Sequence, residues 1–282
     1  MEVALVSCRE LPEPDPDAAP LAAALAAAGI RSEIVAWDDP EADWARARLT
    51  VLRSAWNYPR RHEAFLAWAA RAAGVSELWN PLPVVRWNSH KGYLLELERA
   101  GVPIAPTVLL PRGDRRSLAA ILAERGWGEV VVKPAVSAAS FLTLRCSEEA
   151  LEAGEGHLAR LLAERDALVQ EYLPSVESYG ERALIWIDGE LTHAVRKTPR
   201  FAGEAEHVSH QAVPIAAAEA ALATQALAAV EPPLLYARID LARAHDGAPV
   251  VMELELIEPS LFFAQGPAAL ARFVGAIHRR LA

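Results

Sequence analysis

Lysine and cysteine are both scarce in this sequence of 282 residues. The chain has 28 Lys and Arg residues in total, but only three are lysines: Lys91, Lys133 and Lys197. Because arginine carries the same charge, a position that keeps lysine is a candidate for a role that needs a compact ammonium group. The two cysteines, Cys8 and Cys146, lie far apart and form no metal-binding spacing, which favours a reducing, cytoplasmic location.

Other absences exclude whole classes of protein. No run of 18 apolar residues is present, and the first eight residues resemble a buried strand more than a signal peptide, so we expect no membrane association. The net charge of −9 argues against nucleic acid as a partner, since a phosphate backbone requires a basic surface. A charged fraction of 23% is typical of a folded globular protein, and the length suggests about two domains.

The first third of the chain alternates strand and helix patterns. Strands are expected at 2–7, 32–36 and 49–52, and helices at 21–28 and 62–73. This order predicts a small parallel sheet with helices on its faces. No G-x-G-x-x-G sequence follows the first strand, so a dinucleotide site is not indicated.

The remaining two thirds are predicted to form α+β units. Helices are expected at 90–100, 117–124, 147–164, 216–230 and 267–281. Strands are expected at 107–110, 129–133, 141–145, 167–172, 234–242 and 249–257, with a hairpin around Asp188-Gly189. Asn88 or Ser89 is the expected cap of the helix at 90–100.

Three carboxylates near the C-terminus form the strongest chemical pattern. Alternate residues of a strand share a face, so Asp240 lies with Arg238, and Glu253 lies with Glu255. If the two strands pair, the three carboxylates converge, and hard oxygen ligands of this kind suit Mg²⁺. The alternative is the outward polar face of an exposed hairpin, in which Arg238 pairs with a glutamate.

Two further segments are weaker signals when taken alone. Lys133 ends an apolar strand and precedes the small-residue loop 135–140, whose backbone N–H groups can approach a phosphate. A lysine at a strand end is also often merely solvated. The run 170–174 is a strand that stops at proline, where free backbone groups can contact an adenine edge, or it is only a strand end with a turn.

Together, these segments resemble the ATP-grasp superfamily, in the branch of glutathione synthetase and D-alanine–D-alanine ligase. The matching motifs occur in order over about residues 87 to 265, at 131–134, 169–174, 180–182, 187–189, 237–240 and 253–259. The resemblance implies an ATP-grasp fold of α/β and α+β parts. It divides the chain into an N-terminal parallel-sheet domain at 1–86 and two α+β subdomains at 87–168 and 169–282.

The resemblance also implies ATP and Mg²⁺ as cofactors and assigns a role to each matching residue. The nucleotide-binding residues are Lys91, Lys133, Ser137 and Ser140 for the phosphates, Gln170, Glu171, Tyr172 and Leu173 for adenine, and Glu181 or its alternative Glu177 for the ribose. The Mg²⁺ ligands are Asp240, Glu253 and Glu255. The catalytic residues are Arg238, which stabilises the transferring phosphoryl group, and Lys197, which faces the γ-phosphate or the substrate.

Two positions depart from the family pattern. Glu255 stands where the family usually has Asn, which adds a negative charge to the metal site. The phosphate loop 135–140 contains alanine and serine where the family is rich in glycine, so a stiffer lid is expected.

A narrower similarity covers nearly the whole chain. The segments 53–58, 80–81 and 87–94 resemble the group that contains the cycloserine-forming O-ureido-serine cyclo-ligase. The candidate substrate residues are Arg53, Asn57, Tyr58, His210 and Ser260. For the first three, a helix-capping turn with a buried Trp56 is an equal alternative.

The sequence therefore predicts an ATP-dependent ligase that joins a carboxylate to an amine through an acyl phosphate. Within that class, the narrower similarity implies an intramolecular cyclo-ligase that forms cycloserine from O-ureido-D-serine. An intermolecular amino-acid or peptide ligase and a nucleotide-binding protein without turnover are the alternatives. A small molecule is the expected partner, and homodimers are common in the superfamily.

Overall fold

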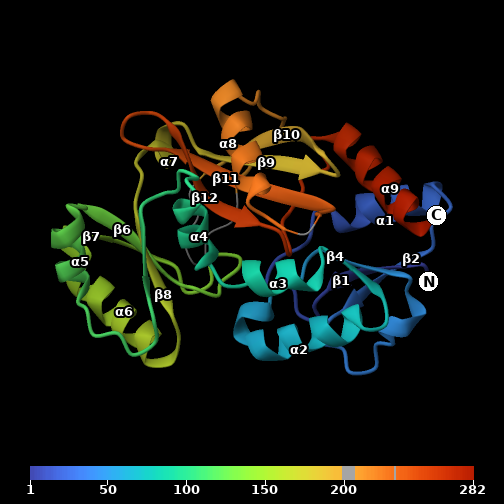
Figure 1. Cartoon of the computed structure of the whole chain (residues 1–282), viewed down its shortest axis with the longest axis horizontal. Coiled ribbons are helices and arrows are strands. Elements are labelled where there is room, and N and C mark those ends of the chain that lie inside the picture. The colour runs from blue at the N-terminus through green and yellow to red at the C-terminus, as the bar shows by residue number, and fades with distance from the viewer. Residues whose placement is uncertain (199–206, 232) are drawn as a thin grey trace.

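Three four-stranded sheets organise the computed structural model, which describes residues 1–198, 207–231 and 233–282 (Figure 1). One sheet comes from the N-terminal third, one from the middle and one from the C-terminal third of the chain. The described ranges contain no helix with the length and apolar character needed to cross a bilayer.

The N-terminal sheet is parallel, with strand order β2-β1-β3-β4. Its strands are β1 (Val3–Ser7), β2 (Ser32–Ala36), β3 (Leu49–Leu52) and β4 (Glu77–Trp79). The helices of this region are α1 (Ala18–Ala27), α2 (His62–Ala73) and α3 (Leu82–Asn88), with 3-10 turns η1 (Trp44–Arg46) and η2 (Tyr58–Arg60). The expected parallel sheet is confirmed, and α1 ends where Gly29 takes a φ of 76°.

The middle sheet is antiparallel, with strand order β5-β8-β6-β7. Its strands are β5 (Thr107–Leu110), β6 (Glu129–Pro134), β7 (Leu144–Ser147) and β8 (Ala167–Glu171). The helices α5 (Leu118–Arg125) and α6 (Leu151–Glu164), with η3 (Glu148–Ala150), share a core with this sheet. The expected domain division stays a prediction, and its boundary at 168/169 falls inside β8, which pairs with β5 and β6.

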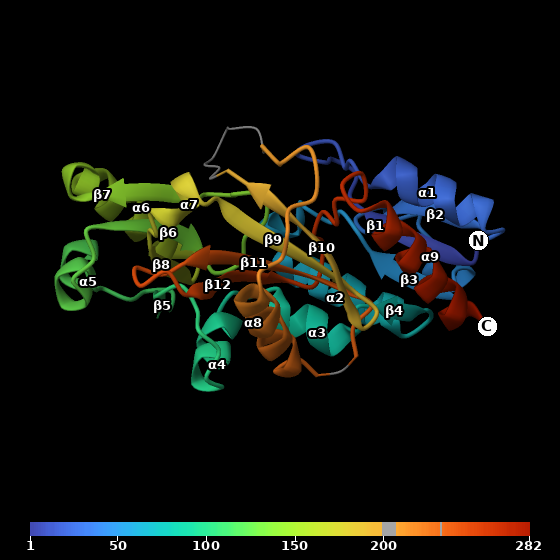
Figure 2. The ribbon, with the colours of Figure 1, turned by 90° about the horizontal axis from the view of Figure 1, so that it is seen from above.

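The C-terminal sheet is also antiparallel, with strand order β10-β9-β11-β12. Its strands are β9 (Glu181–Ile187), β10 (Glu190–Lys197), β11 (Tyr236–Arg243) and β12 (Pro249–Glu255), and its helices are α7 (Ser175–Ser178), α8 (Ala217–Ala228) and α9 (Pro267–Leu281). The Asp188-Gly189 hairpin is confirmed, with both residues at positive φ. Seen from above, β9 to β12 lie between the other two sheets (Figure 2).

Two sequence expectations are corrected. The helix expected at 90–100 is α4 (Tyr93–Arg99), and Asn88 does not cap it, because its side chain hydrogen-bonds the backbone of Leu254 and Leu256. The strand expected at 141–145 is β7, three residues later, because Ser140 and Leu142 take φ angles of 56° and 52°, which a strand does not allow.

The N-terminal and C-terminal sheets share one hydrophobic core. Leu5 of β1 and Leu25 of α1 pack in a single cluster with Ile185 of β9 and Phe273 of α9, and α1 lies beside α9 (Figure 1). The buried carboxylate of Asp17 joins these parts by a polar contact.

Asp17 accepts three backbone hydrogen bonds, from Leu261 at 2.6 Å, Phe262 at 3.1 Å and Phe263 at 2.9 Å. It also lies 3.6 Å from the guanidinium of the buried Arg53. One side chain therefore fixes the segment that follows β12 onto the N-terminal unit.

We predict that Asp17→Asn destabilises the protein by about 2–4 kcal/mol, because it removes the charge that meets Arg53 and replaces an acceptor by a donor. The free energy of unfolding in urea measures this loss. Asp246→Asn is the matched control, since Asp246 is exposed and accepts one turn hydrogen bond from Ala248, and its effect is expected to be within about 0.5 kcal/mol. Equal losses in the two variants would contradict the anchoring role.

Candidate active site

A deep cleft lies between the middle and C-terminal sheets. Its walls come from β6, β8 and the loop after β6 on one side and from β9 to β12 on the other. The predicted residues that line it are Lys91, Lys133, Ser137, Ser140, Gln170, Glu171, Tyr172, Leu173, Glu181, Lys197, Arg238, Asp240, Glu253, Glu255 and Ser260. Residues distant in the sequence thus meet in one pocket.

Strand pairing places the charged side chains on one face of the C-terminal sheet. Arg238 lies opposite Glu255, and Asp240 lies opposite Glu253, as the alternation of the two strands predicts. The intervening Ile239 pairs with Leu254 and packs in the core on the other face. In the same way, Glu181 of β9 lies opposite Lys197 of β10.

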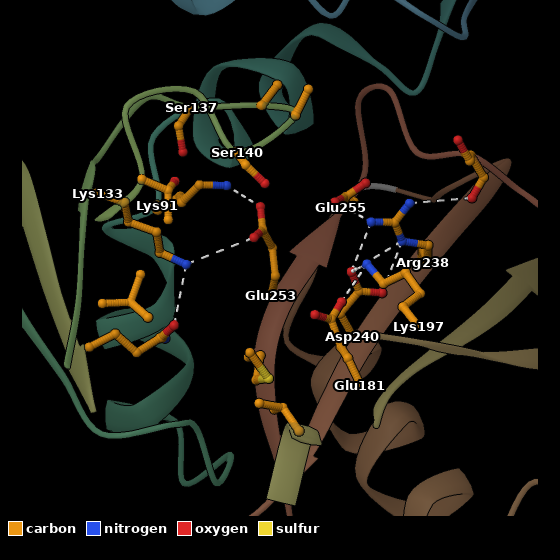
Figure 3. A pocket seen from close by; sticks show the side chains of 18 of the residues that line it. Lys91, Lys133, Ser137, Ser140, Glu181, Lys197, Arg238, Asp240, Glu253 and Glu255 are labelled. Carbon is orange, nitrogen blue, oxygen red and sulfur yellow. Dashed lines mark hydrogen bonds and ion pairs between the residues drawn. The ribbon is translucent and has the colours of Figure 1, made fainter. Parts of the chain in front are cut away.

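The charges form two groups in the cleft (Figure 3). In the first group, Lys91 contacts the Glu253 carboxylate, and Lys133 lies 4.0 Å from the other oxygen of that carboxylate. Lys133 also donates to the side-chain oxygen of Gln170 at 3.2 Å.

In the second group, Asp240 is the common partner. Lys197 lies 2.8 Å from the Asp240 carboxylate and also contacts Glu181. Arg238 reaches Asp240 at 2.8 Å and contacts Glu255. The exposed fractions of Lys91, Lys133 and Lys197 are 6%, 8% and 7%, so all three lysines are buried in this pocket.

These surroundings shift the pKa values in opposite directions. Burial lowers the pKa of Lys133, and the neighbouring Glu253 only partly opposes this. For Lys91, the same burial is outweighed by Glu253, and the pKa is raised. Burial raises the pKa of Glu181 and of Glu255 to about 7, with Asp240 adding to the shift in both cases.

No three carboxylate, histidine or cysteine side chains within the described ranges are grouped closely enough to hold a metal ion. The three predicted Mg²⁺ ligands point to one cleft, but each of them contacts a cationic side chain. For Asp240, Arg238 and Lys197 outweigh the effect of burial and hold its pKa below the ordinary value.

The predicted adenine hinge lies where β8 ends. The Glu171 carboxylate lies 2.9 Å from Nε2 of His245, and the Tyr172 ring lies under the Arg145 guanidinium at 3.8 Å. Glu177, the alternative ribose residue, accepts from Tyr172 at 2.9 Å and from Arg145 at 2.8 Å, but does not line the pocket. Of the two ribose candidates, only Glu181 faces the cleft.

Four of the five candidate substrate residues lie away from the pocket wall, and Ser260 lines it. Arg53 is buried beside Asp17, while Asn57 bonds Trp37 and Asp38, and Tyr58 belongs to the hydrophobic core. His210 is exposed.

Trp56 and Glu258 are among the pocket-lining residues for which the sequence predicts no role. The indole of Trp56 donates to the backbone carbonyl of Glu258 at 2.8 Å, so the two are neighbours although they are far apart in the chain. A carboxylate in the otherwise apolar run after Glu255 was the available signal. Burial, together with Glu255 and Glu253, raises the pKa of Glu258 to about 8.

Comparison with known proteins identifies the family. The chain matches the family described as D-cycloserine synthetase DcsG, N-terminal domain, over residues 3–80. It is 36% identical to the cycloserine biosynthesis protein DcsG of Streptomyces lavendulae, over 95% of this chain and 94% of that protein. The chain belongs to the DcsG family. The crystal structure of D-cycloserine synthetase DcsG superposes with a TM-score of 0.92 over 100% of both chains, at 36% identity.

More distant structures establish the fold. A RimK domain protein, an ATP-grasp protein from Sphaerobacter thermophilus, gives a TM-score of 0.70 at 20% identity, over 99% of both chains. D-alanine–D-alanine ligase from Bacillus anthracis, complexed with ATP, gives 0.66 at 13% identity, over 100% of this chain and 97% of that one. The ATP-grasp fold predicted from the motifs is confirmed, and a DcsG family member with this fold is an ATP-grasp ligase.

The raised pKa of Glu258 predicts an unusual pH dependence of stability. In the folded protein the carboxyl keeps its proton up to about pH 8, whereas the unfolded chain releases it near 4.5. The stability that this proton contributes is therefore complete below pH 4.5 and is lost as the pH rises through 8.

We expect the unfolding free energy of the wild type to fall, relative to Glu258→Gln, by about 1 kcal/mol or more between about pH 5.5 and 8.5. Urea unfolding of both proteins in EDTA at several pH values measures this difference in unfolding free energy. Parallel pH profiles for the two proteins would contradict the shift.

Proposed function

We propose that this protein is an ATP-dependent cyclo-ligase that closes cycloserine from O-ureido-D-serine through an acyl phosphate. The nitrogen attached to oxygen attacks the acyl phosphate and displaces inorganic phosphate, and the carbamoyl group on that nitrogen is lost by hydrolysis as carbon dioxide and ammonia. The observation that carries the proposal is the set of buried cations and carboxylates in one cleft of a DcsG family member. Phosphoryl transfer depends mainly on positioning and on positive charge around the phosphate oxygens, and this cleft supplies both.

Each part of the cleft has a proposed task. Lys91 and Lys133 would hold the nucleotide phosphates, beside Ser137 and Ser140 of the loop after β6, and the hinge 170–173 would bind adenine, with Glu181 at the ribose. Arg238 would stabilise the negative charge that develops on the reacting carboxyl and phosphoryl oxygens, and Lys197 would face the same region. The side chains of the three lysines and Arg238 are buried, and electrostatic contacts to a substrate are stronger where water is excluded.

Mg²⁺ fits the chemistry of the proposed ligands, Asp240, Glu253 and Glu255. All three offer hard carboxylate oxygens from the same face of β11 and β12. When bound, the ion would neutralise phosphate oxygens. The cytoplasmic location and the homodimer expected from the sequence stay predictions.

Measurement of ADP release with O-ureido-D-serine alone, against a panel of amino acids singly and in pairs, tests the proposal. We expect O-ureido-D-serine alone to support Mg²⁺-dependent release, because the ring closes within one molecule, and hydroxylamine to trap the activated carboxyl. Release that requires two substrates would replace the cyclo-ligase by an intermolecular ligase. Nucleotide binding without release would contradict both.

Arg238→Ala is expected to lower kcat for ADP release by about 100-fold or more, since it removes a buried cation from the reacting groups. Folding is preserved to a large extent, because Lys197 still meets Asp240. Arg243→Ala is the matched control, since Arg243 lies at the exposed far end of the same strand and stacks on Tyr179. Wild-type turnover by Arg238→Ala would exclude the assigned role.

A further inference from the structure

Glu258 is a buried pocket carboxylate that the nucleotide and metal assignments leave unused. Its exposed fraction is 8%, and it lines the cleft together with Ser260. Neither a hydrogen bond nor an ion pair joins its carboxylate to any residue in the described part of the chain, although its backbone carbonyl is bonded by Trp56. An ionised carboxylate buried without a partner is costly, so this carboxyl keeps its proton until a cationic ligand contacts it.

The main chain around Glu258 is held firmly in place. Trp56 donates to the Glu258 carbonyl at 2.8 Å, and Arg53 donates to the Pro259 carbonyl at 3.1 Å. Asp17 then accepts the backbone N–H groups of the next turn, from Leu261 onward. The carboxylate is thus presented from a preorganised segment, as a recognition group requires.

The charge around Glu258 favours a cation. Glu255 is its strongest electrostatic neighbour, followed by Lys91, and the two cations Lys91 and Arg238 only partly compensate Glu255 and Glu253. Two of the lysines already form ion pairs with other carboxylates: Lys91 with Glu253, and Lys197 with Asp240. A small positively charged group that enters the pocket would therefore lower the energy of the ionised Glu258.

We propose that Glu258 recognises the α-ammonium group of an α-amino carboxylate substrate, an inference that rests on the proposed function. The substrate would lie with its carboxylate toward Arg238 and its ammonium toward Glu258, since both residues line the same cleft. Specificity for an amino acid over a simple carboxylic acid would then come from this one contact.

The test compares O-ureido-D-serine with an analogue that has hydrogen in place of the α-amino group. In the wild type, we expect kcat/KM for ADP release to favour the amino substrate by about 10- to 100-fold, the size of a lost hydrogen bond between charged groups. Glu258→Gln should lower kcat/KM for the amino substrate by a similar factor and leave the des-amino analogue within about twofold. Its affinity for a non-hydrolysable ATP analogue should be unchanged.

Glu13→Gln is the matched control, because Glu13 is the pocket-lining glutamate of the N-terminal unit and has a partner of its own. We expect it to keep the wild-type preference for the amino substrate. Loss of that preference in Glu13→Gln instead of Glu258→Gln would overturn the inference. Equal losses for both substrates in Glu258→Gln, or no loss, would overturn it as well.

The outcomes also separate this inference from the proposed function. If the wild type turns over O-ureido-D-serine but Glu258→Gln keeps its preference for the amino substrate, only the role of Glu258 fails. If the wild type releases ADP with no α-amino carboxylate of the panel, the function and the inference fail together.

Discussion

Charge balance inside the cleft is the constraint on which the rest of the structure depends. An ion buried in protein costs several kcal/mol unless an opposite charge meets it. Among the described residues that line the cleft, the carboxylates on β11, β12 and the neighbouring segments are Glu181, Asp240, Glu253, Glu255 and Glu258. Four cations lie among them: Lys91, Lys133, Lys197 and Arg238. The positions of the three lysines have a physical reason, because each of them lies in this cleft beside a carboxylate.

The N-terminal unit contributes few residues to the wall of the cleft, but its polar side chains hold the backbone of the strands that form this wall. Asn80 hydrogen-bonds the backbone of β11 and of the segment after β12, through Tyr236 and Leu256. Asn88 donates to the carbonyl of Leu254 and accepts from the N–H of Leu256, and Asp17 accepts from the backbone N–H of Leu261. These contacts fix the backbone whose side chains carry the charges, so the register of β12 is set from outside its own sheet.

The parts of the site that follow from the two-residue alternation of side chains along a strand could be predicted from the sequence. The alternation around Arg238 and Glu253 predicted both the pairing of the strands and the shared polar face, and the motif order predicted the fold. Asn88 was misassigned as a cap because a local rule cannot reveal a partner 166 residues away. The position of Glu258 in the pocket could not be predicted for the same reason, because its contact with Trp56 forms only when the chain folds.

The pKa values of Glu255 and Glu258 are raised because both are buried near other carboxylates in the same cleft. Glu255 and Glu258 are buried three residues apart, and among the described residues the cleft is lined by more carboxylates than cations. Such a site is incomplete by itself, and its energy falls when positive charge arrives. Under the proposed function, a divalent ion and a substrate ammonium are the two cations that enter this cleft, and Glu255 and Glu258 are the carboxylates proposed to bind them.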